Sequence, residues 1–316
     1  MKLIVNIPAL NEAENIAKVI SQIPRKIKGI NQVQVMVIDD GSTDKTVQVA
    51  KKAGADYVVS HPKNLGVGKA MRTAINQALK LKADIMVNID ADGQFSTSDI
   101  PRLIQPILDR QADFVTGSRF IDNRKIKNLS GAKLLGNKIL AKFISWAIKK
   151  RVYDVSCGFR AFSREALLNL NLFGKFTYTQ EMFLDLAAKD LEIGEVLIAV
   201  KYFKNRKSRI AKNLFNYGWQ VFKIILRSFR DYQPLKFFGC VGMVLFLPGF
   251  LGGLSIFIRW LITHHVSPYV SYVYVSMLLM IVGFLLIVLA LIAEMLFRLR
   301  LNQEKILYFE KKRYFK

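Results

Sequence analysis

The chain has 316 residues, 52% of them hydrophobic, and its 47 lysines and arginines outnumber its 24 aspartates and glutamates to leave a formal net charge of +23. This composition excludes a disordered tail, and the apolar fraction is high for a purely soluble protein. The positive charge favours an anionic partner such as a nucleic acid, a bilayer surface or a phosphorylated substrate. Cys157 and Cys240 are too few and too far apart for a disulfide framework or a zinc site.

The first part of the chain alternates between short strands and helices. Runs rich in β-branched residues predict strands over residues 3–7, 33–38, 56–60, 85–89 and 113–117. The segments between them predict helices over residues 12–23, 44–53, 67–81 and 99–110. This order predicts a Rossmann-like α/β domain with a mostly parallel sheet covered by helices. The N-terminal run is interrupted by Asn6 and lacks the pattern of a signal peptide, so we do not expect secretion.

Polar clusters follow four of these predicted strands. They comprise Asn11 with Glu12, Asp39 with Asp40, residues 90–94, and Ser118 with Arg119. In parallel sheets, ligands bind beyond the carboxyl ends of the strands, where the connecting loops gather. We therefore expect the four clusters to converge on one site.

The cluster after the fourth strand carries a pattern that is typical of a metal site. Asp90, Asp92 and Gln94 alternate, and in an extended segment alternate side chains point to one side. Carboxylate and amide oxygens suit Mg²⁺ or Mn²⁺ bound together with substrate phosphates. The alternative is a turn that caps the next helix, for which residues 96–98 are better candidates. We predict a metal site at Asp90, Asp92 and Gln94.

A glycine-containing loop over residues 64–70 opens the third predicted helix. Met71 stands where a dinucleotide fingerprint has its third glycine, and Ala70 stands where a Walker loop has serine or threonine. Two interpretations remain open, a close approach of the backbone to a ligand or an ordinary strand-to-helix turn.

Two long apolar runs lie near the C-terminus. Residues 237–258 and 271–293 contain no charged side chain. As helices, each spans about 30 Å, which is the thickness of the hydrocarbon core of a bilayer. We predict two transmembrane helices rather than a buried soluble hairpin. Gly249, Gly252 and Gly253 permit close helix contact, compatible with a homo-oligomer, although lipid exposure of these glycines is an equal alternative.

The charges that flank these runs predict their orientation. Basic residues accumulate before the first run and after the second, whereas residues 263–270, which join them, contain no lysine or arginine. The positive-inside rule then places both termini in the cytoplasm. Proximity to anionic lipids accounts for much of the net charge, and no nucleic-acid module is recognisable, so we expect no nucleic-acid partner.

A helix with two unlike faces precedes the first apolar run. Over residues 214–232, aromatic side chains occupy one face and basic side chains the other. This pattern favours a helix in the membrane interface, and the alternative is packing of its aromatic face on the preceding domain. We divide the chain into a cytoplasmic domain (1–210), this juxtamembrane helix (211–235), two transmembrane helices (236–298) and a basic cytoplasmic tail (299–316).

The motifs together resemble those of glycosyltransferase family 2. The resemblance covers residues 1 to about 210 and rests on motifs that occur in the family's order. These are Pro8-Ala9-Leu10-Asn11-Glu12, Asp39-Asp40-Gly41-Ser42-Thr43-Asp44, Asn64-Leu65-Gly66-Val67-Gly68, Asp90-Ala91-Asp92-Gly93-Gln94, Gly117-Ser118-Arg119-Phe120, Cys157-Gly158-Phe159-Arg160 and Tyr178-Thr179-Gln180-Glu181. More narrowly, the chain resembles polyprenyl-phosphate glycosyltransferases of the dolichol-phosphate mannose synthase type, in the branch with two membrane helices.

The resemblance implies a GT-A fold and inverting transfer of a hexose, mannose or glucose, from a GDP- or UDP-sugar to polyprenyl phosphate, with Mg²⁺ or Mn²⁺ as cofactor. The residues that it implies for nucleotide-sugar binding are Pro8, Ala9, Asn11, Glu12, Asp39, Asp40, Lys69, Asp90, Ala91 and Ser208. Those implied for catalysis are Asp92, Arg119 and Arg209, and those implied for the acceptor phosphate are Arg119, Lys133 and Lys138. The basic segment departs from the family pattern, because Phe203 stands where an arginine is usual.

Three other functions remain as alternatives. A lipid phosphate is already anionic, whereas a hydroxyl acceptor needs a general base. Glu181 is the candidate base for transfer to a glycan or glycolipid hydroxyl, and Asp185 lies four residues further along the same helix. A non-catalytic membrane scaffold is a second alternative, and the intact aspartate clusters argue against it. A polynucleotide-binding protein is the third.

Overall fold

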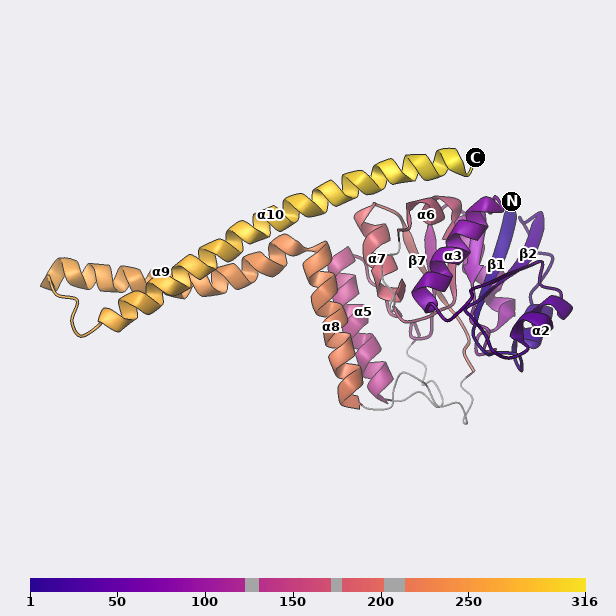
Figure 1. Ribbon diagram of the computed structural model, residues 1–316, viewed down its shortest axis with the longest axis horizontal. Coiled ribbons are helices and arrows are strands. Elements are labelled where there is room, and N and C mark those ends of the chain that lie inside the picture. Colours follow the sequence, from indigo (N-terminus) through magenta and orange to yellow (C-terminus); the bar gives the residue numbers. More distant parts are fainter. Residues whose placement is uncertain (123–130, 172–177, 202–213) are drawn as a thin grey trace. The chain divides into compact units, whose positions relative to one another are not determined.

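The computed structural model describes residues 1–122, 131–171, 178–201 and 214–316 (Figure 1). These residues form two compact units. The first comprises Met1–Val221 together with Glu304–Lys316, and the second comprises Phe222–Gln303.

The first unit is built around a seven-stranded sheet. Its strands are β1 (Lys2–Ala9), β2 (Gln32–Asp39), β3 (Tyr57–Ser60), β4 (Ile85–Asn88), β5 (Phe114–Ser118), β6 (Arg160–Ser163) and β7 (Ile193–Leu197). They lie in the order β3-β2-β1-β4-β6-β5-β7. Every pair is parallel except the two that β6 makes with β4 and β5. The predicted mostly parallel sheet is confirmed.

Both faces of the sheet are buried. Leu3, Val5 and Ile7 of β1 point to one face and join a large apolar cluster with residues of the helices on that side. Ile4 and Met36 point to the other face and are also fully buried. Burial on both faces explains why these strands are nearly continuous apolar runs rather than alternating ones.

Helices connect most of the strands. They are α1 (Ile16–Ser21), α2 (Thr46–Lys52), α3 (Val67–Lys80), α4 (Ile100–Leu108), α5 (Gly131–Ile148), α6 (Arg164–Asn169) and α7 (Tyr178–Ala188). A short 3₁₀ turn, Thr97–Asp99, leads into α4. The predicted helix over residues 12–23 is shorter than expected, because the segment before Ile16 forms a turn in which the Glu12 carbonyl accepts from the N–H groups of Asn15 and Ile16. The N–H groups of Glu12 and Ala13 bond to the side chains of Thr46 and Asp44.

The second unit holds two long apolar helices. α8 (Leu214–Tyr232) leads into α9 (Pro234–Thr263), and α10 (Val270–Tyr314) follows (Figure 1). By length and composition, α9 and α10 are able to cross a membrane, as the sequence predicts. The predicted amphipathic segment at 214–232 coincides with α8.

Small residues bring α9 and α10 together. A Cβ atom on Gly249 would lie 2.7 Å from the backbone nitrogen of Met280, and one on Gly242 would lie 2.9 Å from the carbonyl oxygen of Gly283. Gly252 also faces α10, whereas in the described part of the chain nothing lies within 4 Å of a Cβ on Gly253. Two of the three glycines singled out from the sequence therefore serve contact between helices of the same chain.

The end of α10 belongs to the first unit. Residues 299–316, predicted as a basic tail, continue α10 as far as Tyr314. Lys189 of the first unit lies 2.5 Å from a carboxylate oxygen of Glu304, and Lys311 donates to Asn171 Oδ1 at 2.7 Å. Buried contacts of this kind hold the chain terminus against the residues that follow β6 and α7.

Candidate active site

The loops after β1 and β2 bond to each other at the carboxyl end of the sheet. The backbone N–H of Asn11 donates to Ser42 Oγ at 2.9 Å, and Asn11 Oδ1 accepts from the backbone N–H of Thr43 at 2.9 Å. Asn11 has a positive φ of 53°, a conformation that asparagine tolerates better than most residues. Asp39 is buried, and its carboxylate accepts from the backbone N–H of Ser42 at 3.2 Å. The predicted convergence of the first two clusters is therefore present.

The other predicted nucleotide-site residues of this region lie around the same loops. Pro8 and Ala9 end β1, Ala91 is buried after β4, and Lys69 is exposed in the first turn of α3. Asp40 is buried, and its carboxylate accepts hydrogen bonds from the loop that precedes α3. The nucleotide-binding roles of these residues stay predictions.

Asp90 and Asp92 follow β4 and lie close to one another. The carboxylate of Asp90 is surrounded by protein, although the residue as a whole is partly exposed. Burial, and then the negative charge of Asp92, raise the pKa of Asp90 to about 7, while Arg160 and Arg119 act in the opposite direction. The negative charge of Glu12 also raises the pKa of Asp90. Asp90 is therefore within electrostatic range of side chains from the loops after β1, β4 and β5.

The local backbone differs from the expectation. The sequence argument places Asp90, Asp92 and Gln94 on one side of an extended segment, but residues 91–93 form a turn, with Gly93 at a φ of 69°. The backbone N–H of Gln94 donates to Asp92 Oδ1 at 3.0 Å, as in a tight polar turn. The assumed extended geometry is wrong because the chain must reverse after β4 to enter the helical turn at Thr97.

The two aspartates fit a divalent cation in two respects. They are oxygen donors held close enough for mutual repulsion, which a cation would relieve. Gly158 also leaves space for Asp90, because a Cβ atom at that position would overlap its carboxylate oxygens. Among the described residues, no group of three or more histidine, cysteine, aspartate or glutamate side chains is arranged to hold a metal by itself. Gln94 or substrate phosphates are the natural further ligands.

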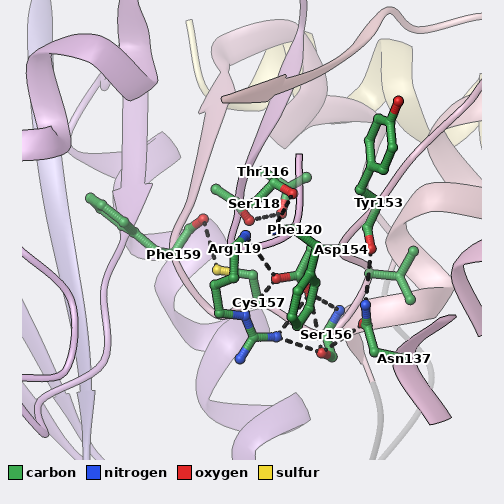
Figure 2. Close-up of polar contacts among 12 residues, drawn as sticks. Thr116, Ser118, Arg119, Phe120, Asn137, Tyr153, Asp154, Ser156, Cys157 and Phe159 are labelled. Atoms are coloured by element: carbon green, nitrogen blue, oxygen red, sulfur yellow. Dashed lines mark hydrogen bonds and ion pairs between the residues drawn. The ribbon is translucent and has the colours of Figure 1, made fainter. Parts of the chain in front are cut away.

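Arg119 is held by a buried carboxylate. Its Nε lies 2.5 Å from Asp154 Oδ2, and its Nη2 lies 2.8 Å from Asp154 Oδ1, so the pair is bidentate (Figure 2). Asp154 has no exposed side-chain surface, whereas Arg119 keeps 13%. A bidentate pair with a buried partner restricts the guanidinium to one orientation. Sequence reasoning identified Arg119 but not Asp154.

The network continues from Arg119 to α5. Arg119 Nη2 donates to Ser156 Oγ at 2.7 Å, and Ser156 Oγ donates to Asn137 Oδ1 at 3.0 Å (Figure 2). Asn137 in turn donates to the carbonyl oxygen of Tyr153 at 2.9 Å. The helix that carries Lys138 is therefore bonded to the loop that holds Arg119.

Glu195 of β7 holds the backbone at Tyr153 and Asp154 in place. Its carboxylate accepts from the backbone N–H groups of Tyr153, at 3.0 Å, and Asp154, at 2.8 Å. Burial raises the pKa of Glu195 above its usual value of 4.5, although these hydrogen bonds act in the opposite direction. A glutamate in a short strand carries no sequence signal for this role, because its partners lie on a distant loop.

Arg160 is a second arginine at the site. It is fully buried, and it donates to the carbonyl oxygens of Cys157, Val155 and Thr179 at 2.7 to 3.0 Å. Its guanidinium also lies over the rings of Phe114 and Phe183. From this position, the positive charge of Arg160 lowers the pKa of Asp90. The sequence analysis recognised the motif that ends in Arg160. It did not predict that the Arg160 side chain is fully buried.

The two candidate bases on α7 have different surroundings. Asp185 is buried and lies 2.9 Å from Lys189, which also contacts Glu304. Burial raises its pKa, while Lys189 lowers it and Glu304 raises it. Asp185 therefore forms an ion pair with Lys189, and its role as a base stays a prediction. Glu181 is partly exposed in the first turn of α7.

Several predicted residues lie in parts of the chain that are not described. Phe203, Ser208 and Arg209 lie outside the described residues, and so does the side chain of Lys133. Lys138 is exposed on α5. The roles proposed for these residues stay predictions.

Comparisons with known proteins identify the family of the chain. The family model described as Glycosyl transferase family 2 matches residues 4–170. Over 223 residues the chain is 34% identical to UDP-N-acetylglucosamine--dolichyl-phosphate N-acetylglucosaminyltransferase of Methanococcus voltae. The aligned region covers 64% of this chain and 87% of that protein. Over 183 residues it is 30% identical to dolichol-phosphate mannosyltransferase of Pyrococcus furiosus, covering 54% of this chain and 49% of the relative.

A solved structure shares the fold. It is glucosyl-3-phosphoglycerate synthase from Mycobacterium tuberculosis in complex with Mn²⁺, UDP-glucose and phosphoglyceric acid. The TM-score is 0.53 and the identity is 26%, over 72% of this chain and 79% of that chain. The expected GT-A fold is thereby confirmed. With the family model matching more than half of its length, this chain belongs to glycosyltransferase family 2 and is a glycosyltransferase.

Proposed function

We propose that the chain transfers a hexose from a nucleoside-diphosphate sugar to a polyprenyl phosphate, with inversion, at the cytoplasmic face of a membrane. The observation that carries the proposal is the position of Arg119. Asp154 orients its guanidinium, and the charge of Arg119 reaches Asp90, one of the candidate metal ligands. A cation suited to binding phosphate is thus within electrostatic reach of a carboxylate suited to a metal–diphosphate.

The donor side of the proposal uses the loops after β1, β2 and β4. Asp90, Asp92 and Gln94 would hold Mg²⁺ or Mn²⁺, which neutralises charge on a diphosphate leaving group when it is bound. The relative from Methanococcus voltae is named for a UDP-sugar, and the solved neighbour contains UDP-glucose and Mn²⁺. These names support a nucleotide sugar as donor here. Both contain uracil, and guanine stays the alternative that the sequence left open.

The acceptor side uses Arg119 and α5. Leu135, Ile139 and Trp146 of α5 are 61%, 48% and 51% exposed, and their spacing places them in one stripe of the helix. Lys138 and Lys142 are also exposed and lie beside this stripe. An apolar stripe next to lysines suits contact with an anionic bilayer surface. Through Asn137 and Ser156, this helix is bonded to Arg119, which would receive the lipid phosphate.

A phosphate acceptor also suits the ionisable groups of the site. A phosphate oxygen carries its negative charge at neutral pH, so it attacks the anomeric carbon without a strong general base. Asp185 is occupied by Lys189, and Asp154 by Arg119. α9 and α10 would keep the chain at the membrane in which such an acceptor resides.

The test is a transfer assay with a matched pair of acceptors. Purified full-length chain in detergent receives radiolabelled UDP-glucose, UDP-N-acetylglucosamine or GDP-mannose, with a short polyprenyl phosphate or the same polyprenol lacking phosphate. We expect label in the lipid phase from one donor, only with the phosphate, only with Mg²⁺ or Mn²⁺, and not with a chelator. Labelling of the polyprenol or of a hydroxyl-bearing glycolipid instead would overturn the proposal and make Glu181 the leading base candidate.

A further inference from the structure

The loop between β3 and α3 is fixed to the end of β2 by one carboxylate. Asp40 Oδ1 accepts from the backbone N–H of Leu65 at 3.0 Å, and Asp40 Oδ2 accepts from the backbone N–H of Gly66 at 2.9 Å. Both oxygens of Asp40 therefore point at the loop. The loop is thereby bonded to the candidate nucleotide region, and both interpretations of residues 64–70 stay open.

His61 completes the attachment. Its Nδ1 lies 2.7 Å from Asp40 Oδ1, and its Nε2 lies 3.0 Å from Thr73 Oγ1 of α3. A carboxylate only accepts, so Nδ1 donates to Asp40, and in the neutral ring Nε2 accepts from the Thr73 hydroxyl. The side chains of His61 and Asp40 are only 9% and 8% exposed. The imidazole thus joins the end of β2 to the second turn of α3.

Backbone packing shows how closely the loop approaches β2. Gly41 has a φ of 80°, and a Cβ atom there would lie 2.6 Å from the backbone nitrogen of Asn64 and would also overlap Lys63. Glycine is thus required by conformation and by space. The same short segment, Asp39 to Ser42, bonds to Asn11 on its other side. One turn therefore positions two loops of the candidate nucleotide pocket relative to each other.

We propose that Asp40 and His61 are positioning residues for the nucleotide of the donor. They hold Leu65, Gly66 and the first turn of α3, which carries Lys69, at the carboxyl ends of β2 and β3. Asp40 acts through this loop, and its carboxylate oxygens do not bind the nucleotide. This inference rests on the proposed function, because it takes a nucleoside diphosphate as the ligand.

The roles of the two residues predict a specific kinetic signature. Loosening the loop weakens nucleotide binding before and during transfer alike, so it raises the KM for the sugar donor and leaves kcat and the KM for the acceptor nearly unchanged. A residue that only supports folding would instead lower the amount of active protein and leave the KM for the donor unchanged.

The experiment compares two amide replacements of His61. An asparagine at position 61 places its amide nitrogen near the position of Nδ1 and retains the bond to Asp40. A glutamine places it near Nε2 and loses that bond. Binding of UDP or GDP, whichever the wild type binds, is measured by calorimetry with Mg²⁺ for the full chain, together with donor KM and kcat. Glu192→Gln is the control. Glu192 directly precedes β7 and forms an exposed ion pair with Lys150, so the change also replaces a carboxylate by an amide but leaves the His61–Asp40 contact intact.

We expect His61→Asn to bind nucleotide within about threefold of wild type, and His61→Gln and Asp40→Asn to bind about tenfold more weakly, the usual effect of losing a hydrogen bond to a charged group. Equal affinity of wild type, His61→Asn and His61→Gln would overturn the inference. Reduced kcat with unchanged donor KM would overturn it as well. Failure of the wild type to bind either nucleotide would instead overturn the proposed function.

Discussion

Gly158 lies directly against Asp90. A Cβ atom on Gly158 would lie 2.6 Å from Asp90 Oδ2 and 2.9 Å from Oδ1. The missing side chain at position 158 therefore leaves room for the carboxylate in its present position. The loop before β6 and the turn after β4 thus shape one side of the candidate metal site together.

Replacing this glycine tests whether the position of Asp90 matters. In Gly158→Ala, the added methyl must push the carboxylate of Asp90 aside, and overpacking of this kind costs about 1–3 kcal/mol of stability. We expect metal-dependent nucleotide binding to fall by about tenfold or more, since Asp90 leaves its position. Gly131→Ala is the matched control, because no atom of the described residues lies within 4 Å of a Cβ there. Unchanged metal-dependent nucleotide binding in Gly158→Ala would contradict the assignment of Asp90 as a metal ligand.

Asp92 is expected to act in metal binding rather than in folding. Asp92→Ala removes one carboxylate from the pair and should lower transfer by about a hundredfold or more, with Mg²⁺ or Mn²⁺ no longer strengthening nucleotide binding. The melting temperature should stay near that of the wild type, because Asp92 is partly exposed. Asp109→Asn, a change at the exposed C-cap of α4, serves as control. Full transfer by Asp92→Ala would remove the metal assignment.

The pair between Asp154 and Arg119 predicts an effect on the acceptor alone. Asp154→Asn keeps the size of the side chain but removes the charge that orients Arg119, so transfer should fall about tenfold to a hundredfold. The loss should be visible as a higher KM for polyprenyl phosphate or a lower kcat, with nucleotide binding unchanged. A calorimetric nucleotide titration beside the kinetics separates the two sites. If nucleotide binding fell instead, Arg119 would belong to the donor site.

Glu195 predicts a dependence of stability on pH. Because its pKa is raised in the folded chain, folded Glu195 binds a proton at pH values where the unfolded side chain has lost it. The stability that protonated Glu195 contributes is therefore complete below about pH 4.5 and is lost as the pH rises through the raised pKa. Glu195→Gln removes this titration. The melting temperature of the wild type relative to Glu195→Gln should fall between pH 4.5 and neutral, and a constant difference would contradict the assignment.

Much of the architecture follows from local patterns in the sequence. The five predicted strands match β1 to β5 within two residues at each end, since apolar runs between helices have few other ways to bury both faces. The apolar runs near the C-terminus likewise correspond to α9 and α10. β6 and β7 were not predicted, because β6 begins with Arg160 and β7 contains Gly194 and Glu195, so neither is a run of β-branched residues.

The alternation of strands and helices was enough to predict that the clusters gather at the carboxyl edge of the sheet, because parallel strands bring their ends together whatever the loops contain. The part that each side chain plays there depends on contacts that no local pattern encodes. Asp40 holds a loop and Asp185 an ion pair, and Asp154 orients an arginine 35 residues earlier in the chain. An aspartate has the same local sequence signal in each of these roles. The difference lies in the partner that folding places within hydrogen-bond distance, and that partner is remote in sequence.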